Sequence, residues 1–122
     1  MEFKEQKAIY LQIVEHLCDE ILSGKYHQGD KLPSVRELAM EAEVNVNTVA
    51  RSLEWLQQKG VAITRRGLGN FVTEGGIEAV ETLRREEFFS EQLPDLFRVM
   101  RALGVGIGEV VEHWQAQMQP CS

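Results

Sequence analysis

The sequence predicts a mostly α-helical fold with one small β-hairpin. Apolar residues recur at helical spacing over most of the 122 residues. The exceptions are VAIT and FVTE, two short β-branched or aromatic segments that flank the glycine-bearing stretch RRGLGN. Beyond residue 75 the pattern is helical again, so we expect two parts, residues 1–75 and 76–122.

The composition indicates a folded protein without membrane-spanning or secretory segments. A hydrophobic fraction of 43% can fill a core. No apolar run approaches the roughly 18 residues of a membrane span, and the N-terminus has no signal-peptide pattern. We therefore expect a cytoplasmic protein that does not contact a membrane. Cys18 and Cys121 match no metal or disulfide spacing, and we assign neither a function.

The first helix is predicted from Gln6 to Ser23. Its apolar positions recur every four residues, at Ile9, Ile13, Leu17 and Ile21. Gly24 is expected to end the helix in a left-handed conformation. The segment KYHQGDK that follows is interpreted as a polar turn.

A second, short helix is predicted to begin after Ser34 and to end near Glu43. Ser34 with Glu37 three residues later is a capping-box pattern. A third helix begins around NVNTV and reaches Lys59, where Gly60 stops it. Its apolar face holds Val49, Leu53 and Leu56, and its polar face holds Asn47, Arg51, Glu54 and Gln58.

Three helical segments are predicted after the hairpin. They cover residues 77–90, residues 94–103, and a last stretch that contains Ile107 and Met118. Pro94 either starts a helix or kinks one continuous helix, and the sequence leaves both open.

A short helix, a tight turn and a polar-faced helix together form the helix-turn-helix pattern. Its second helix can enter the major groove of DNA with its N-terminal residues at base edges and phosphates. Asn45, Asn47 and Thr48 suit that position, although Asn45, like Ser34, would also be chosen as a helix cap without DNA. Arg51, one turn further on, can reach guanine or phosphate.

The hairpin has the features of a DNA-binding wing. Arg65 and Arg66 stand before Gly67 and can enter the minor groove, although charges at a hairpin tip also discourage edge pairing. Lys31 and Arg36, near the start of the second helix, can hold the phosphate backbone. The sequence therefore predicts a winged helix-turn-helix.

The net charge of −6 argues at first against a nucleic-acid partner. Residues 1–73, however, carry nine Lys/Arg against ten Asp/Glu, whereas residues 74–122 carry four against nine. DNA binding requires a local basic face and not a basic protein. A winged helix that binds a protein partner stays the alternative, but it gives the wing arginines no role.

No enzymatic or metal site is predicted. The sequence has no nucleophile–base pair and no phosphate loop, and the spacing of His16, His27 and His113 fits no tight ligand motif. We expect no enzyme activity, no cofactor and no metal. A small-molecule effector is left open.

Residues 9–72 resemble the N-terminal domain of the GntR family of bacterial regulators, through LPSVRELA, VNVNTVARSL and RRGLGNFV. The resemblance implies a sequence-specific DNA-binding transcription regulator. Two residues depart from the family pattern. Val46 replaces a frequent proline, and Trp55 stands where a small, aliphatic or charged residue is frequent. The Trp55 ring can pack on the wing or on the C-terminal helices. The complete set of expected DNA-binding residues is Lys31, Ser34, Arg36, Asn45, Asn47, Thr48, Arg51, Arg65, Arg66 and Gly67.

The short helical remainder resembles the YtrA subfamily. This implies a repressor of its own operon, which can include transporter genes. We further expect a homodimer that binds an inverted-repeat operator of double-stranded DNA. Apolar stripes on the last helices favour such a dimer because exposed stripes of that width are unfavourable in a monomer. The expected interface residues are Leu93, Leu96, Phe97, Met100, Ile107, Val110, Val111 and Trp114.

Overall fold

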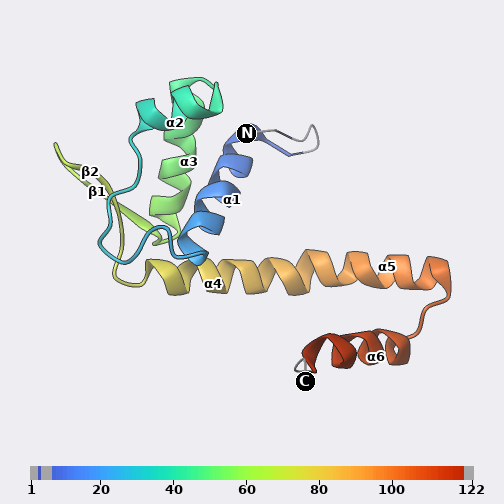
Figure 1. Ribbon diagram of the computed structural model, residues 1–122. Coiled ribbons are helices and arrows are strands. Elements are labelled where there is room, and N and C mark those ends of the chain that lie inside the picture. The colour runs from blue at the N-terminus through green and yellow to red at the C-terminus, as the bar shows by residue number, and fades with distance from the viewer. Residues whose placement is uncertain (1–2, 4–6, 120–122) are drawn as a thin grey trace. The chain divides into compact units, whose positions relative to one another are not determined.

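The computed structural model describes residue 3 and residues 7–119 (Figure 1). The chain divides into two compact units, residues 1–83 and 84–122. The expected division between residues 75 and 76 lies earlier in the chain than this one. Cys121 and Gln6, the expected start of the first helix, lie outside the described residues. Lys7 and Ala8 are not helical, so the first helix begins at Ile9, later than expected.

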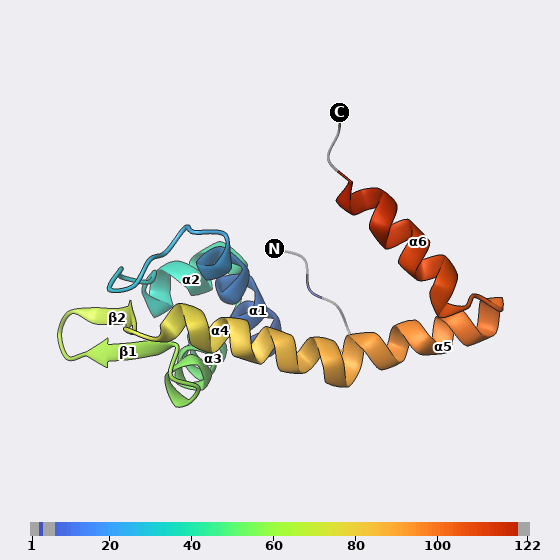
Figure 2. The same cartoon turned by 90° about the horizontal axis from the view of Figure 1, so that it is seen from below.

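In the described residues of the first unit, three helices and the start of a fourth accompany a two-stranded antiparallel hairpin. The elements are α1 (Ile9–Leu22), α2 (Val35–Ala42), α3 (Val46–Gln58), β1 (Ala62–Arg65), β2 (Gly69–Val72) and the start of α4 (Gly76–Glu87). Helices α1 and α3 pack side by side, and the hairpin projects from them (Figures 1 and 2). This is the winged helix-turn-helix that the sequence predicts.

Local signals fix the ends of these helices as expected. Gly24 has a φ of +91°, and the N–H of Lys25 donates to the carbonyl of Glu20, which together form a Schellman-type end for α1. The Oγ of Ser34 accepts a hydrogen bond from the N–H of Glu37 (3.1 Å) and so caps α2. The C-terminus of α3 is followed by Gly60 with a φ of +78°.

One core holds the first unit together. Leu17 of α1, Val49 and Leu56 of α3 and Val61 are fully buried, and Cys18 is a buried free thiol in the same cluster. Burial of this kind stabilises by about 1.5–3 kcal/mol for each large aliphatic side chain. The expected apolar face of α3 is therefore confirmed. The expected face of α1 is confirmed at Ile13, Leu17 and Ile21, whereas Ile9, at the start of the helix, is 43% exposed.

The interpretation of KYHQGDK as a polar turn was wrong for the last residues of the segment, which pair with β2. The N–H of Gly29 donates to the carbonyl of Val72, the N–H of Val72 donates to the carbonyl of Asp30, and the N–H of Leu32 donates to the carbonyl of Asn70. Residues 29–32 thus pair with the edge of β2 that β1 leaves open. Such pairing satisfies backbone groups that an edge strand would otherwise expose.

The beginning of α4 belongs to the core of the first unit. Val80 is fully buried in the core cluster, and Ile77 and Leu83 pack against it. Gly76, the first residue of α4, is also buried. The first turns of α4 thus close the core beneath the hairpin.

The second unit contains the end of α4, a π-helical segment η1 (Phe88–Gln92), α5 (Leu93–Leu103) and α6 (Ile107–Met118). The backbone stays helical from Arg84 to Leu103, so Pro94 does not break it. Pro94 lies in the first turn of α5, and just before it the N–H of Leu93 donates to the carbonyl of Phe88, five residues back. A wider turn before a proline relieves the clash of its ring with the preceding turn.

Helices α5 and α6 carry apolar side chains that their own unit does not cover. Met100 is buried there, and Leu93 and Val110 are half-buried. Phe97 is 43% exposed and Trp114 is 61% exposed. The remaining expected interface residues, all exposed, are Leu96, Ile107 and Val111.

Candidate nucleic-acid interface

The turn between α2 and α3 presents the N-terminus of α3 to solvent. Glu43 ends α2 in the left-handed conformation (φ 56°), and the N–H of Val44 donates to the carbonyl of Ala39. Leu38 and Leu53 are buried where the two helices pack. This packing fixes α3 behind a tight turn, which is the geometry that a DNA-reading helix requires.

The first turn of α3 carries three expected contact residues. The Oδ1 of Asn45 accepts a hydrogen bond from the N–H of Asn47 (2.7 Å), so Asn45 caps the helix. Asn45 and Asn47 are exposed, and Thr48 is half-buried. Polar groups at a positive helix end suit phosphate and base edges.

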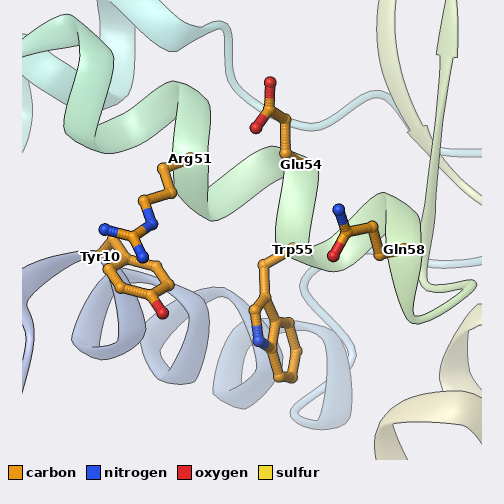
Figure 3. A pocket seen from close by; sticks show the side chains of 5 residues that line it. All are labelled: Tyr10, Arg51, Glu54, Trp55 and Gln58. Carbon is orange, nitrogen blue, oxygen red and sulfur yellow. The ribbon is translucent and has the colours of Figure 1, made fainter.

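The Arg51 side chain takes a path that the periodicity alone does not predict. It is exposed, but its guanidinium carbon lies 3.9 Å from the centre of the Tyr10 ring in α1 (Figure 3). The side chain thus leans toward α1 and does not extend straight from the polar face of α3. Periodicity fixes the direction of a Cβ atom, whereas the path of a long side chain depends on a neighbour that is distant in sequence.

The wing places its cations at and beside its tip. Arg65 is not in the turn but in β1, paired with Gly69, and its guanidinium lies 5.3 Å from the centre of the Phe71 ring. Arg66 and Gly67 form the exposed tip, where Gly67 has a φ of +78°. Glycine adopts this conformation without strain.

Lys31 belongs to the wing as much as to the start of α2. It forms an isolated antiparallel bridge with Phe71 in β2. A Cβ atom on Gly69 would lie only 3.0 Å from the Cε of Lys31, so the lysine side chain crosses the wing where glycine leaves room. Arg36, in the first turn of α2, is exposed, and Ser34 is half-buried. The sequence did not predict that Lys31 lies next to the hairpin.

A polar cluster that the sequence did not reveal joins the wing to α3. The Nε2 of Gln57 donates to the Oδ1 of Asn70 (3.0 Å) and to the Oγ1 of Thr64. The Oγ1 of Thr64 donates to the Oδ1 of Asn70 (2.6 Å). Thr64 and Asn70 are paired across β1 and β2, so Gln57 ties both strands to the end of α3.

Gln57→Leu should loosen the wing without unfolding the unit. Each partly exposed hydrogen bond contributes about 0.5 kcal/mol, so we expect amide hydrogen exchange in β1 and β2 to accelerate by roughly fivefold. Gln58→Leu, the same change at the exposed neighbouring position, is the control and should leave these amides unchanged. Equal exchange rates in both variants would show that Gln57 does not hold the wing.

Trp55 packs against the core cluster of the first unit. Its half-buried ring contacts the core cluster and lines an open groove of about 260 Å³ with Tyr10, Arg51, Glu54 and Gln58 (Figure 3). The Nζ of Lys59 lies 5.5 Å from the ring centre. The groove is open and polar, and the structure assigns it no effector.

Within residue 3 and residues 7–119, no three His, Cys, Asp or Glu side chains gather in a way that could hold a metal ion. In the same described part of the chain, no helix combines the length and the apolar character needed to cross a membrane.

The model of the "bacterial regulatory proteins, gntR family" matches residues 9–72. The uncharacterized regulator YhcF of Bacillus subtilis is 36% identical over 111 residues, which is 91% of this chain and 90% of that protein. The transcriptional repressor YtrA of the same organism is 37% identical over 88 residues, which is 69% of this chain and 68% of that protein.

Two solved structures extend the comparison. A putative GntR-family regulator from Bacteroides thetaiotaomicron shares 41% identity with a TM-score of 0.76, covering 92% of this chain and 97% of its own. The DNA-binding domain of AraR, solved in complex with operator ORR3, shares 28% identity with a TM-score of 0.51, covering 52% of this chain and 77% of its own.

Proposed function

Because the chain belongs to the GntR family of DNA-binding transcriptional regulators, which are not enzymes, we propose that it is a repressor that binds an operator as a homodimer. The observation that carries the proposal is the exposed, polar N-terminus of α3 next to a cationic wing in one compact unit. The relative YtrA is named a repressor, and AraR was solved on an operator. Control of its own operon stays a prediction.

We assign DNA binding to the first unit and dimerisation to the second. In this assignment Asn47 and Thr48 face base edges, and Arg66 at the tip enters the minor groove. Lys31 and Arg36 hold phosphates. The residues assigned in addition are Ser34, Asn45, Arg51, Arg65 and Gly67.

A two-fold dimer places two copies of α3 on one face of the duplex. The operator should then be an inverted repeat with half-sites about 10 bp apart. Support comes from the exposed apolar side chains of α5 and α6, which a monomer leaves in water. The acidic surplus after residue 73 also suits a part that stays away from phosphates.

The wing is tested by replacing Arg65 and Arg66 with alanine in the full chain. Loss of two cations that face DNA should reduce the slope of log affinity against log salt by up to about two units. The measurement is fluorescence anisotropy on a duplex that the unaltered chain selects from a randomised DNA pool. Lys59→Ala, which removes a cation at the other end of α3 from Asn45, is the control and should keep the slope.

An unchanged slope for the double variant would mean that the wing points away from DNA. If the unaltered chain selects no duplex at all, the repressor proposal itself fails. A winged helix with a protein partner would then be the better account of the fold.

A further inference from the structure

Tyr10 touches α3 at two consecutive residues. Its ring lies under the guanidinium of Arg51, with 3.9 Å between the guanidinium carbon and the ring centre. Its backbone carbonyl accepts a hydrogen bond from the Oγ of Ser52 (2.7 Å), a side chain that is fully buried between the helices. The side chain and the backbone of one residue in α1 therefore both contact α3.

The stack gives Arg51 a defined direction. An exposed arginine normally samples many rotamers, and much of that freedom is lost when it binds a phosphate or a base. A guanidinium 3.9 Å from an aromatic ring is within the range of a cation–π contact. The Tyr10 ring therefore restricts Arg51 before any partner arrives, and restriction in the bound geometry raises affinity.

That direction favours a phosphate over a base edge. Figure 3 shows Arg51 turned toward α1, whereas Glu54, which lines the same groove, points away from α1. The Glu54 carboxylate repels phosphates, so the DNA backbone is favoured beside Arg51 and not beside Glu54. A base-reading side chain would instead extend from the groove-facing surface of the helix.

We propose that Tyr10 is a positioning residue for DNA binding, whose ring presets the Arg51 guanidinium at the α1 edge of α3 for contact with a backbone phosphate. The proposal rests on the proposed function above. It adds a residue of α1 to the determinants of affinity, at a position that does not itself have to touch DNA.

A double-mutant cycle in the full chain tests the proposal. Tyr10→Leu removes the ring, Arg51→Ala removes the guanidinium, and a third protein carries both changes. The affinity of each protein for the duplex selected by the unaltered chain is measured at several salt concentrations. Tyr10→Phe, which keeps the ring and loses only the hydroxyl, is the matched control.

Arg51→Ala should weaken binding by roughly tenfold and reduce the salt slope by about one unit, without changing the ranking of base-substituted duplexes. Tyr10→Leu should weaken binding by roughly threefold in the unaltered chain and cause no further loss in the Arg51→Ala background. Tyr10→Phe should bind like the unaltered chain. If Tyr10→Leu does not fold, Tyr10→Met takes its place in the cycle.

The measurements distinguish a failure of the Arg51 assignment from a failure of the positioning role of Tyr10. If Arg51→Ala leaves affinity unchanged, the assignment of Arg51 to the DNA interface fails, and this proposal fails with it. If Arg51→Ala weakens binding but loss of the ring has no effect, strengthens binding, or weakens it equally in both backgrounds, Tyr10 does not position Arg51. In that case the repressor function stands. A changed base preference in Arg51→Ala would overturn the phosphate assignment.

Discussion

If the proposed homodimer forms through α5 and α6, Phe97→Glu should dissociate it and lower the affinity for the proposed operator by roughly a hundredfold. Phe97 is 43% exposed on α5, on the side that also carries Leu96 and the buried Met100. A carboxylate in a dimer interface must be desolvated without a partner, which is highly unfavourable. Each monomer would then bind one half-site, and the gain from linking two half-sites would be lost.

Ala102→Glu is the matched control for this change. It adds the same charge to the same helix, at an exposed position on the other side of α5 from Phe97. Light scattering should show a dimer for Ala102→Glu and a monomer for Phe97→Glu, and circular dichroism should show unchanged helix content in both. A dimeric Phe97→Glu protein would mean that the interface lies elsewhere.

The parts of the fold that sequence could predict are those decided within a few residues. Ser34 and Asn45 cap their helices because their side-chain oxygens reach an N–H two or three positions ahead. Gly24 and Gly104 end helices because a positive φ is unfavourable for other residues. The α5 and α6 stripes follow from periodicity in the same way.

The parts that sequence could not predict depend on contacts between distant residues. Residues 29–32 carry no strand pattern and pair with β2 because the fold brings them to its open edge. The contact between Gln57 and the hairpin joins residues that only the folded wing brings together. Arg51 was assigned to the right helix face, but only the structure shows that Tyr10, in another helix, directs it.

These differences change how the candidate interface should be understood. The sequence presents separate cations, whereas the structure places three of them beside another residue: Arg65 lies near Phe71, Lys31 crosses Gly69, and Arg51 lies on Tyr10. An arginine or lysine restricted by its neighbours loses less conformational entropy on binding than a free one. The aromatic and glycine residues of the first unit therefore contribute to the proposed DNA affinity through the cations that they hold.

Among the glycines of the first unit, Gly76 is the one where an added Cβ would meet its neighbours most closely. A Cβ atom there would lie 2.7 Å from the carbonyl oxygen of Val61 and 2.9 Å from a methyl of Val72. The carbonyl of Val61 cannot easily move, because it accepts a hydrogen bond from the N–H of Thr73 (3.0 Å). The close approach holds the start of α4 against the base of the wing.

We therefore expect Gly76→Ala to lower the free energy of unfolding by about 2 kcal/mol, as overpacking of a filled core does. Alanine also favours a helix over glycine, but by only about 0.5–1 kcal/mol, so the clash should dominate. Gly75→Ala is the control, because a Cβ at Gly75 meets nothing within 4 Å. Urea unfolding should show a lower midpoint for Gly76→Ala and a midpoint close to that of the unaltered chain for Gly75→Ala.

Equal midpoints for the two variants would mean that α4 can move away from the wing at no cost. The wing, and with it Arg65 and Arg66, would then be held by Gln57 and by the pairing of residues 29–32 with β2.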